Sequence, residues 1–368
     1  MIIGMFTDQL RGGGKERRMV ELMKALTEKG EYSFVVVMIN GKGKDDCAYR
    51  YIYDYDVKFY YLGELSLLQK TYKMKTIAQN EHLDLIHYWA PPIYAYMLFP
   101  IWTLHKVPII NSSITSARKQ GGNKFWLVKL SYFMFDKILS NSQHALLVNK
   151  VPRRKAICIY NGFDPQRAII KRTPEEVRSQ YGIKTRYIVS MAAEYSFRKD
   201  WPMFVKAANK LVLEGIDVTF LAMGSGDASQ YEILIEDDAR CKDRIRFVGR
   251  EKDVESVFNA SDVVVLATCV EGVSNSIMEG MALGKPIVST KGPYVGTAEI
   301  VNDGESGYLV DYHDYKAFAE RIRELICNKE LRCQMGNLSR KIIKERFGIE
   351  QMTDAFAEVY NMFQSPNN

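Results

Sequence analysis

The sequence predicts an α/β protein built on parallel sheets, and three observations lead to that class. Residues 262–290 read as a buried strand, a loop, a short helix and a second strand opened by Pro286, which is the unit that builds a parallel sheet. Residues 2–39 repeat this order, with a glycine-rich turn between the strand and the helix. At 368 residues the chain is long enough for two domains, each with a sizeable core.

Composition favours a globular protein of a reducing compartment. Hydrophobic residues make up 47% of the chain, an ordinary fraction for a globular protein. The six cysteines form no C-x-x-C pair, and no histidine stands at metal-ligand spacing, so we expect neither a disulfide framework nor a structural zinc. The N-terminus does not resemble a signal peptide, and the apolar run 91–104 contains prolines and is too short to span a bilayer. We therefore expect a cytoplasmic protein.

Charge is distributed unevenly along the chain. The formal net charge is +10 for residues 1–170 and −4 for residues 171–368, which together give the overall +6. A basic first half suits an anionic partner, such as a diphosphate-linked lipid, an acidic glycan or the inner face of an anionic membrane. Solubilising lysines would explain the same excess without any partner. Nothing in the pattern points to nucleic acid.

The first domain begins with a strand over Ile2–Phe6 and a helix over about Lys15–Lys29. Between them, Gly12, Gly13 and Gly14 would let the backbone approach a ligand closely, because glycine has no side chain. The spacing fits neither the dinucleotide fingerprint nor the P-loop. Alone, the turn is weak support for a phosphate site.

Two further features of the first domain have both a functional and a structural interpretation. His87 ends a predicted strand, where functional groups gather, but a structural histidine is the preferred interpretation. The stretch from Lys124 to Phe135 is rich in aromatic residues with interleaved lysines. It could lie on a membrane surface, or it could be a packed helix, since apolar residues fall on nearly every side.

The second domain follows a basic, proline-containing hinge over Arg167–Pro174. It repeats the alternation with strands over Tyr187–Ala192 and Val218–Met223 and a helix between them over Trp201–Glu214. Gly224 opens a phosphate-type turn directly after the second of these strands. No acid stands where a dinucleotide site needs one for the ribose, so a dehydrogenase is not expected.

The strongest candidate site lies where the buried strand Val263–Leu266 ends. Ligands bind beyond the carboxyl ends of parallel strands, and Glu271 and Glu279 stand there eight residues apart. Ser274, Asn275 and Ser276 lead into the helix, whose first backbone N–H groups and dipole suit a phosphate. We expect Glu279 in the first turn of that helix. Either glutamate has a simpler interpretation: Ser276 and Glu279 could form a capping box, and Glu271 could be a solvated loop carboxylate.

At these residues the chain resembles the retaining glycosyltransferases with the E-x7-E motif, the group 1, family 4-like enzymes of the GT-B fold. The match runs from Glu271-Gly272 through Glu279-Gly280-Met281-Ala282-Leu283-Gly284-Lys285-Pro286-Ile287-Val288, with Gly280 in place of the usual alanine. Gly12 to Arg17 resembles the family's GG-x-E-R turn, and the turn at Gly224 its G-x-G. The resemblance extends over nearly the whole chain and is tightest over residues 245–310.

The resemblance implies two Rossmann-like, doubly wound domains facing across a cleft. It places the acceptor-binding domain at 1–168, the donor-binding domain at 169–345, and at 346–368 a helix that crosses back to the first domain. It implies a metal-independent hexosyltransferase that takes a sugar from a UDP- or GDP-linked donor to a hydroxyl on a glycan, lipid-linked or protein acceptor. No other cofactor is implied.

The same resemblance implies the roles of individual residues. Glu279 would hold the ribose hydroxyls, and Glu271 would hold the sugar. Arg198, Lys199, the turn at Gly13 and Gly14, and the amides of Ser274, Asn275 and Ser276 would stabilise the departing diphosphate, beside the turn at Gly224. These residues make up the expected donor site.

Two positions depart from the family. Asn111-Ser112-Ser113 stand where many relatives have a catalytic histidine, so we expect the diphosphate to take the acceptor proton. Glu194 stands where relatives have an arginine that contacts the diphosphate. A carboxylate about 4 Å from a phosphate would cost on the order of 4 kcal/mol at an effective dielectric near 20, so we expect Glu194 to point away and Arg198 to act with Lys199.

Three other functions stay open. A glycoside hydrolase could use Glu271 and Glu279 as an acid and base pair. An epimerase of nucleotide sugars shares the fold, and a non-catalytic nucleotide-sugar-binding subunit would fit the two departures. We rank glycosyl transfer in cell-surface polysaccharide or glycolipid synthesis above them.

Overall fold

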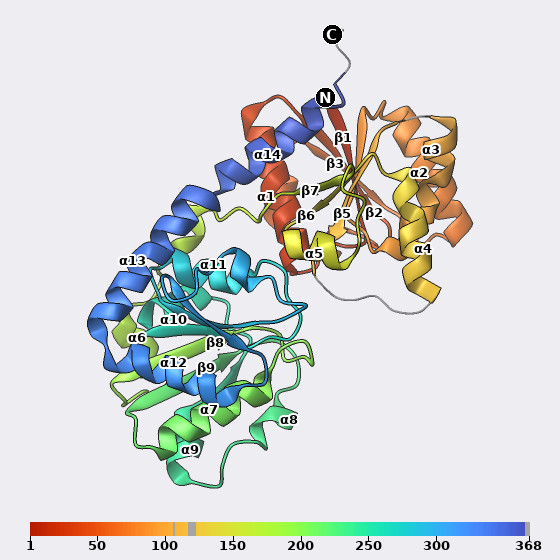
Figure 1. Ribbon diagram of the computed structural model, residues 1–368. Coiled ribbons are helices and arrows are strands. Elements are labelled where there is room, and N and C mark those ends of the chain that lie inside the picture. The colour runs from red at the N-terminus through yellow and green to blue at the C-terminus, as the bar shows by residue number, and fades with distance from the viewer. Residues whose placement is uncertain (106, 117–122, 365–368) are drawn as a thin grey trace. The chain divides into compact units, whose positions relative to one another are not determined.

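The computed structural model describes residues 1–105, 107–116 and 123–364, and this part of the chain divides into two compact units (Figure 1). Residues 1–162 and the segment that starts at Ile349 form the first unit, and residues 163–348 form the second. The N–H of Phe163 donates to the carbonyl of Phe347 at 2.7 Å, which ties together the two ends of the second unit. We expected the divisions after residues 168 and 345.

The first unit contains, in its described residues, a seven-stranded sheet in the order β3-β2-β1-β4-β5-β6-β7, and all its pairings are parallel. Buried aliphatic residues fill β1 and β2, so that Ile3 lies opposite Phe34 on one side and Leu85 of β4 on the other. The strands are β1 (Ile2–Thr7), β2 (Ser33–Met38), β3 (Val57–Tyr61), β4 (Leu85–Tyr88), β5 (Ile109–Ile114), β6 (Lys137–Ser140) and β7 (Ala156–Cys158).

Helices connect these strands, and the last helix of the chain packs among them. Helix α14 (Ile349–Asn361) lies beside α1 (Gly14–Lys29) in Figure 1, and Phe356 and Tyr360 from α14 join the core cluster that includes Trp89. The other helical segments are η1 (Lys44–Asp46), η2 (Arg50–Asp54), α2 (Leu67–Asn80), η3 (Pro92–Leu98), α3 (Phe99–Leu104), α4 (Asn123–Ser131), η4 (Tyr132–Met134) and α5 (Gln143–Val148).

The second unit is built on a six-stranded parallel sheet in the order β10-β9-β8-β11-β12-β13. From β8 the chain first adds strands on one side and then returns to add β11 on the other. The carboxyl ends of β8 and β11 therefore form the switch point at which open α/β sheets bind ligands. The strands are β8 (Tyr187–Ala192), β9 (Val218–Met223), β10 (Ile245–Gly249), β11 (Val263–Leu266), β12 (Ile287–Lys291) and β13 (Gly307–Asp311).

Helices cover both faces of this second sheet. Helices α7 (Trp201–Leu213), α9 (Ala239–Arg244) and α12 (Tyr315–Cys327) pack together, while α11 (Asn275–Ala282) packs with α10 (Val254–Ala260) and α13 (Lys329–Arg346). Gly280 lets α11 approach the sheet, because a Cβ there would lie 2.9 Å from Val264. The remaining segments are η5 (Pro165–Ala168), α6 (Pro174–Gln180), α8 (Ser229–Glu232) and η6 (Thr297–Glu299).

The structure bears on the expectations about a membrane-spanning segment and about the aromatic stretch of the first unit. No helix in the described ranges is long and apolar enough to cross a membrane. The aromatic stretch predicted from Lys124 to Phe135 folds as α4 and η4, although the side chains of Lys124 and Phe125 lie outside the described residues.

Candidate donor-binding site of the second unit

A short pairing at the switch point joins the loop after β8 to the loop after β11. Lys199 forms an antiparallel bridge with Thr268, and the N–H of Asp200 donates to Ala267 O at 3.0 Å. One residue further along, the N–H of Cys269 donates to Arg198 O at 2.9 Å. The pairing fixes residues 198–200 against the loop that carries Glu271.

Glu271 forms an ion pair with Lys199 at this pairing. Only 21% of the Glu271 side chain and 11% of the Lys199 side chain are exposed. The N–H of Gly272 donates to Glu271 Oε1 at 3.2 Å, and the backbone of Glu271 bonds to Tyr294 and Gly296. Glu271 is therefore a fixed, mostly buried carboxylate, and its interpretation as a solvated loop residue is wrong.

Glu279 lies on α11 and forms an ion pair with Arg167 of η5. Its side chain is only 8% exposed, so the carboxylate is held in one place by a cation from 112 residues away. Helix α11 begins at Asn275 with Ser274 as its N-cap, and its first turn contains no acidic residue. The expectation that Glu279 belongs to the first turn is therefore wrong. The alternative capping box between Ser276 and Glu279 also does not form, because the N-cap lies two residues earlier.

The start of α11 keeps the features predicted for it. Ser274 does not cap the helix with its side chain, and its hydroxyl lies 3.1 Å from that of Ser276. The backbone amides of Ser274, Asn275 and Ser276 thus belong to a helix start, where the peptide dipoles favour negative charge. Their contact with a phosphate stays a prediction.

Glu194 and Arg198 form a separate ion pair at 2.7 Å after β8. Both side chains are about half exposed, at 52% and 46%. Glu194, at the position where the resemblance predicts an arginine, is therefore a carboxylate that neutralises the neighbouring Arg198. A donor diphosphate would have to compete with Glu194 for Arg198. Binding of the diphosphate by Arg198 stays a prediction.

Gly224 follows β9 and allows a close backbone approach at the same edge of the sheet. Its N–H donates to Gly249 O at 2.9 Å, and a Cβ at this position would collide with the carbonyl of Ala193 and the ring of Tyr195. The glycine is thus required by packing, whether or not the turn contacts a ligand.

In the first unit, the predicted donor-site residues lie at the start of helix α1. Gly13 is the N-cap of α1, and Gly14 is the first residue of that helix. The carbonyl of Gly13 accepts a hydrogen bond from the Tyr49 hydroxyl at 2.9 Å. The turn is therefore held in place at a helix start, and its approach to a diphosphate stays a prediction.

His87 is a structural residue, as preferred from the sequence. Its side chain is fully buried, with Nδ1 2.7 Å from the Tyr360 hydroxyl and Nε2 2.7 Å from the Ser112 hydroxyl. Burial, and next the charge of Arg18, lower the pKa of His87 well below its usual value. The imidazole is therefore neutral and enclosed, which does not suit a base that must reach an acceptor.

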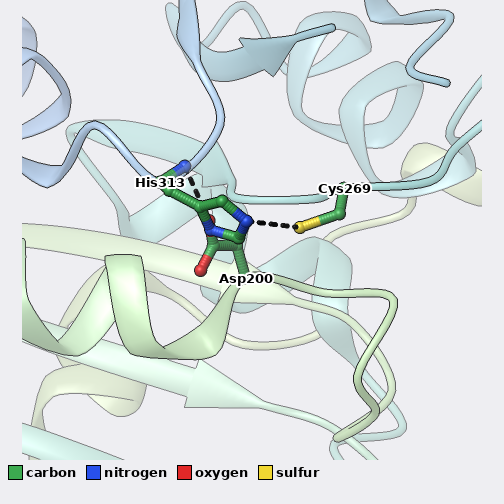
Figure 2. A group of neighbouring side chains, drawn as sticks. All are labelled: Asp200, Cys269 and His313. Carbon is green, nitrogen blue, oxygen red and sulfur yellow. Dashed lines mark hydrogen bonds and ion pairs between the residues drawn. The ribbon is translucent and has the colours of Figure 1, made fainter. Parts of the chain in front are cut away.

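One cluster of side chains beside the donor loops was not predicted from the sequence. Asp200, Cys269 and His313 come from three separate segments, and their potential ligand atoms lie within 4.8 Å of one another (Figure 2). Spacing rules cannot detect such a group, because it spans more than a hundred residues of sequence. Arg167 was also missed, since it was assigned only to a hinge.

The second unit and the whole chain resemble known glycosyltransferases. Residues 185–328 match the family described as glycosyl transferases group 1. The chain is 26% identical over 306 residues to the N-acetyl-alpha-D-glucosaminyl L-malate synthase of Bacillus anthracis, covering 78% of this chain and 77% of that protein. It is 25% identical over 352 residues to the lipopolysaccharide core biosynthesis glycosyltransferase LpsE of Rhizobium meliloti (strain 1021), covering 95% and 96%.

Solved structures show the same fold at low identity. A glycosyltransferase from Rickettsia africae ESF-5 has a TM-score of 0.83 at 20% identity and covers 100% of this chain and 99% of its own. Anabaena Alr3699/HepE in complex with UDP-glucose has a TM-score of 0.82 at 18% identity, covering 98% and 100%. The predicted fold class of two Rossmann-like parallel-sheet units is confirmed, and so is the resemblance to group 1 glycosyltransferases.

Proposed function

We propose that the protein is a retaining glycosyltransferase, because residues 185–328 match the group 1 glycosyl transferases and the chain has the GT-B fold. It would move a hexosyl group from a nucleoside-diphosphate sugar to a hydroxyl acceptor, in the synthesis of cell-surface polysaccharide or glycolipid. One observation carries the proposal: Glu271 and Glu279 are each fixed by a cation from a distant segment at the switch point of the sheet.

The two glutamates are proposed to bind the two ends of the donor. Glu279 is held on α11 by Arg167, so its carboxylate can accept hydrogen bonds from ribose hydroxyls without first losing side-chain entropy. Glu271 is proposed to accept hydrogen bonds from hydroxyls of the transferred sugar. Neither role requires a covalent intermediate on the enzyme.

Charge stabilisation would come from groups that are already in place. As the sugar leaves, negative charge develops on the diphosphate, and Lys199 beside Glu271 supplies a partly buried cation. The amides of Ser274, Asn275 and Ser276 supply the positive end of a helix dipole. These fixed groups would stabilise the charge that a divalent metal ion stabilises in other transferases. Arg198 would contribute once its ion pair with Glu194 is broken.

Proton transfer is proposed to use the donor itself. His87, the histidine at a strand end in the first unit, is buried between Ser112 and Tyr360. The acceptor oxygen would bond to the anomeric carbon on the face from which the diphosphate leaves, and a diphosphate oxygen would take the acceptor proton. Attack on that same face would retain the configuration at the anomeric carbon.

The first experiment is a thermal-shift screen of UDP-, GDP- and ADP-sugars. A donor at a hundred times its dissociation constant adds about 2.7 kcal/mol to the stability of the protein that binds it. We expect one nucleotide class to stabilise the chain, with the shift lost in Glu279→Ala and kept in Glu345→Ala, an exposed glutamate of α13. Equal shifts in both variants would contradict the proposed donor site.

Product analysis then separates transfer from the other functions. Transfer predicts nucleotide release that depends on an acceptor and is lost in Glu271→Ala. Sugar release without an acceptor would indicate a hydrolase, and a changed sugar on an intact nucleotide would indicate an epimerase. Binding with no reaction in the presence of polysaccharide or lipid-linked acceptors would favour a non-catalytic subunit.

We also propose that the first unit contacts an anionic membrane. Exposed apolar side chains gather on helices that pack against one another, a set we call the apolar face: Leu67, Leu68, Tyr72, Ile93, Phe99, Trp102, Leu104, Trp126, Leu127, Leu130 and Phe133. The ring centroids of Trp102 and Phe133 lie 5.0 Å apart, and the ammonium of Lys129 lies 5.8 Å from the ring of Trp126. Aromatic and aliphatic side chains with adjacent lysines are typical of surfaces that insert into charged interfaces.

Sedimentation with lipid vesicles tests the membrane contact. We expect binding to vesicles that contain phosphatidylserine and none to pure phosphatidylcholine. Leu68→Gln combined with Trp126→Gln should abolish binding, whereas Ile233→Gln, which changes an 80% exposed residue of the second unit, should not. Equal sedimentation of all three proteins would exclude the apolar face as the contact.

A further inference from the structure

Three side chains beside the donor loops are arranged as a metal centre would require, although nothing in the proposed reaction uses them. Asp200 is the N-cap of α7, Cys269 follows β11, and His313 lies in the turn between β13 and α12. Figure 2 shows the imidazole of His313 between the other two, with one ring nitrogen toward the carboxylate and the other toward the sulfur.

Asp200 fixes the position of His313. The carboxylate is only 3% exposed, and its Oδ2 lies 2.6 Å from His313 Nδ1 and accepts the His313 backbone N–H at 2.8 Å. His313 adopts a left-handed backbone conformation with φ of 69°, which is unfavourable for a residue with a side chain. These two contacts with Asp200 hold His313 in that conformation, with Nδ1 toward the carboxylate and Nε2 toward Cys269.

The distance between Nε2 and the sulfur is compatible with a shared metal ion. His313 Nε2 and Cys269 Sγ form a long contact of 3.9 Å. Two ligands on one tetrahedral zinc, at about 2.0 to 2.1 Å for nitrogen and about 2.3 Å for sulfur, would lie about 3.6 Å apart. The observed separation is slightly longer than this value, so a small movement of the exposed His313 side chain would bring both atoms within reach of one ion.

We propose that Cys269 and His313 form a binding site for a thiophilic divalent transition metal ion of the zinc class, with Asp200 as the residue that positions His313. The arrangement matches the carboxylate–histidine–zinc triad of metalloproteins. The His313 side chain is 65% exposed, so solvent supplies the remaining ligands and gives the ion a path of entry. This inference does not rest on the proposed function.

Binding must displace the thiol proton. Burial, together with the charge of Asp200, raises the pKa of Cys269 to about 11, so the sulfur is protonated at neutral pH. Formation of the metal–sulfur bond therefore releases one proton to the buffer. With two protein ligands and a proton to displace, the site is expected to be weaker than a four-ligand structural zinc site.

Equilibrium dialysis of the untagged, reduced chain against Zn²⁺ measures the affinity. We expect one ion per chain at this site, with affinity at least tenfold weaker in Cys269→Ser and in His313→Ala. Asp200→Asn keeps an N-cap oxygen for α7 but loses the charge that holds His313, and loss of such a partner typically weakens affinity 10- to 100-fold. Matched controls are Cys333→Ser and His82→Ala, both exposed and distant in sequence, which should bind as the unmodified chain does.

A second measurement needs no variant of the site. Zn²⁺ should slow the alkylation of Cys269 by iodoacetamide, as read by mass spectrometry of its peptide, at least tenfold more than it slows Cys327 and Cys333, which are exposed and serve as internal controls. Undiminished zinc affinity in Cys269→Ser or His313→Ala would overturn the proposal. Equal slowing of all three cysteines would overturn it as well.

Discussion

The two units share one architecture but arrange polar groups at their strand ends in opposite ways. In the second unit, the charged side chains beyond β8 and β11 are matched by opposite charges, as in Lys199 with Glu271 and Arg167 with Glu279. In the first unit, His87 and Arg18 are enclosed by apolar side chains near β4 and α1. Arg18 is fully buried beside the rings of Trp89 and Phe356.

This difference separates a binding role from a structural one. A charge that is paired with another side chain can exchange that partner for a ligand, because the ligand replaces the lost interaction. His87 and Arg18 are buried against α14, so a ligand cannot replace their partners. These two side chains instead stabilise the packing of the first unit.

The largest effect is expected from Lys199→Ala. The change removes the cation proposed to stabilise the leaving diphosphate and breaks the ion pair of Glu271, so kcat should fall about 100- to 1,000-fold. Steady-state kinetics with the donor found in the screen would measure it, with Lys341→Ala, an exposed lysine of α13, as the matched control. A fall of less than threefold would remove Lys199 from the proposed mechanism.

Arg167→Ala should destabilise the second unit by about 3 kcal/mol. The change removes the cation that pairs with the carboxylate of Glu279, whose side chain is 8% exposed, and breaking a buried ion pair is costly. Urea unfolding measures the loss, and Arg167→Ala with Glu279→Ala should recover part of it. If the double variant is as unstable as the sum of the single ones, the pair is not coupled.

Arg18→Met should stabilise the first unit by about 1 to 2 kcal/mol. Burial lowers the pKa of Arg18 to about 10, and its Nε and Nη1 find no hydrogen-bond partner among the described residues. The methionine keeps the packing against Trp89 and Phe356 and removes a desolvated charge. Its cost is one hydrogen bond to the carbonyl of Ile159. A lower urea midpoint would show that this bond and the ring contacts outweigh desolvation.

His87 should make the first unit sensitive to mild acid. Its folded pKa is lowered, so below the unfolded value of about 6.5 the unfolded chain binds the extra proton and stability falls as the pH falls. Between pH 6.5 and 5.5 the unmodified chain should lose about 1 kcal/mol more than His87→Gln, as measured by urea unfolding at both pH values. An identical loss in both proteins would show that His87 does not titrate in this way.

Much of the fold could be predicted because its signals are local. The strands Val218–Met223 and Val263–Leu266 have the bounds expected from their apolar patterns and turn residues. Strand β3 and helix α2 were not predicted, since β3 is only partly buried and α2 exposes Leu67 and Leu68 at its start. Their patterns do not match the periodicity on which such predictions depend.

The candidate site was predicted in its sequence positions but not in its interactions. Glu271 and Glu279 were identified by their spacing, whereas Lys199 reaches Glu271 across 72 residues and Arg167 reaches Glu279 across 112. The capping-box alternative required Ser276 as the N-cap, whereas Ser274 is the N-cap of α11, so that box does not form. Asp200, Cys269 and His313 gave no local signal at all.

Most strands and helices, the glycine turns and the positions of the two acids could be predicted from the amino-acid sequence, because periodicity, steric freedom and chain reversal depend on neighbouring residues. Only the tertiary structure decided which cation holds which carboxylate, that α14 packs against α1, and that Cys269 meets His313. Those contacts depend on where the sheet brings distant segments together. Ion pairs and metal ligands are selected by distance in space, for which separation along the chain gives no measure.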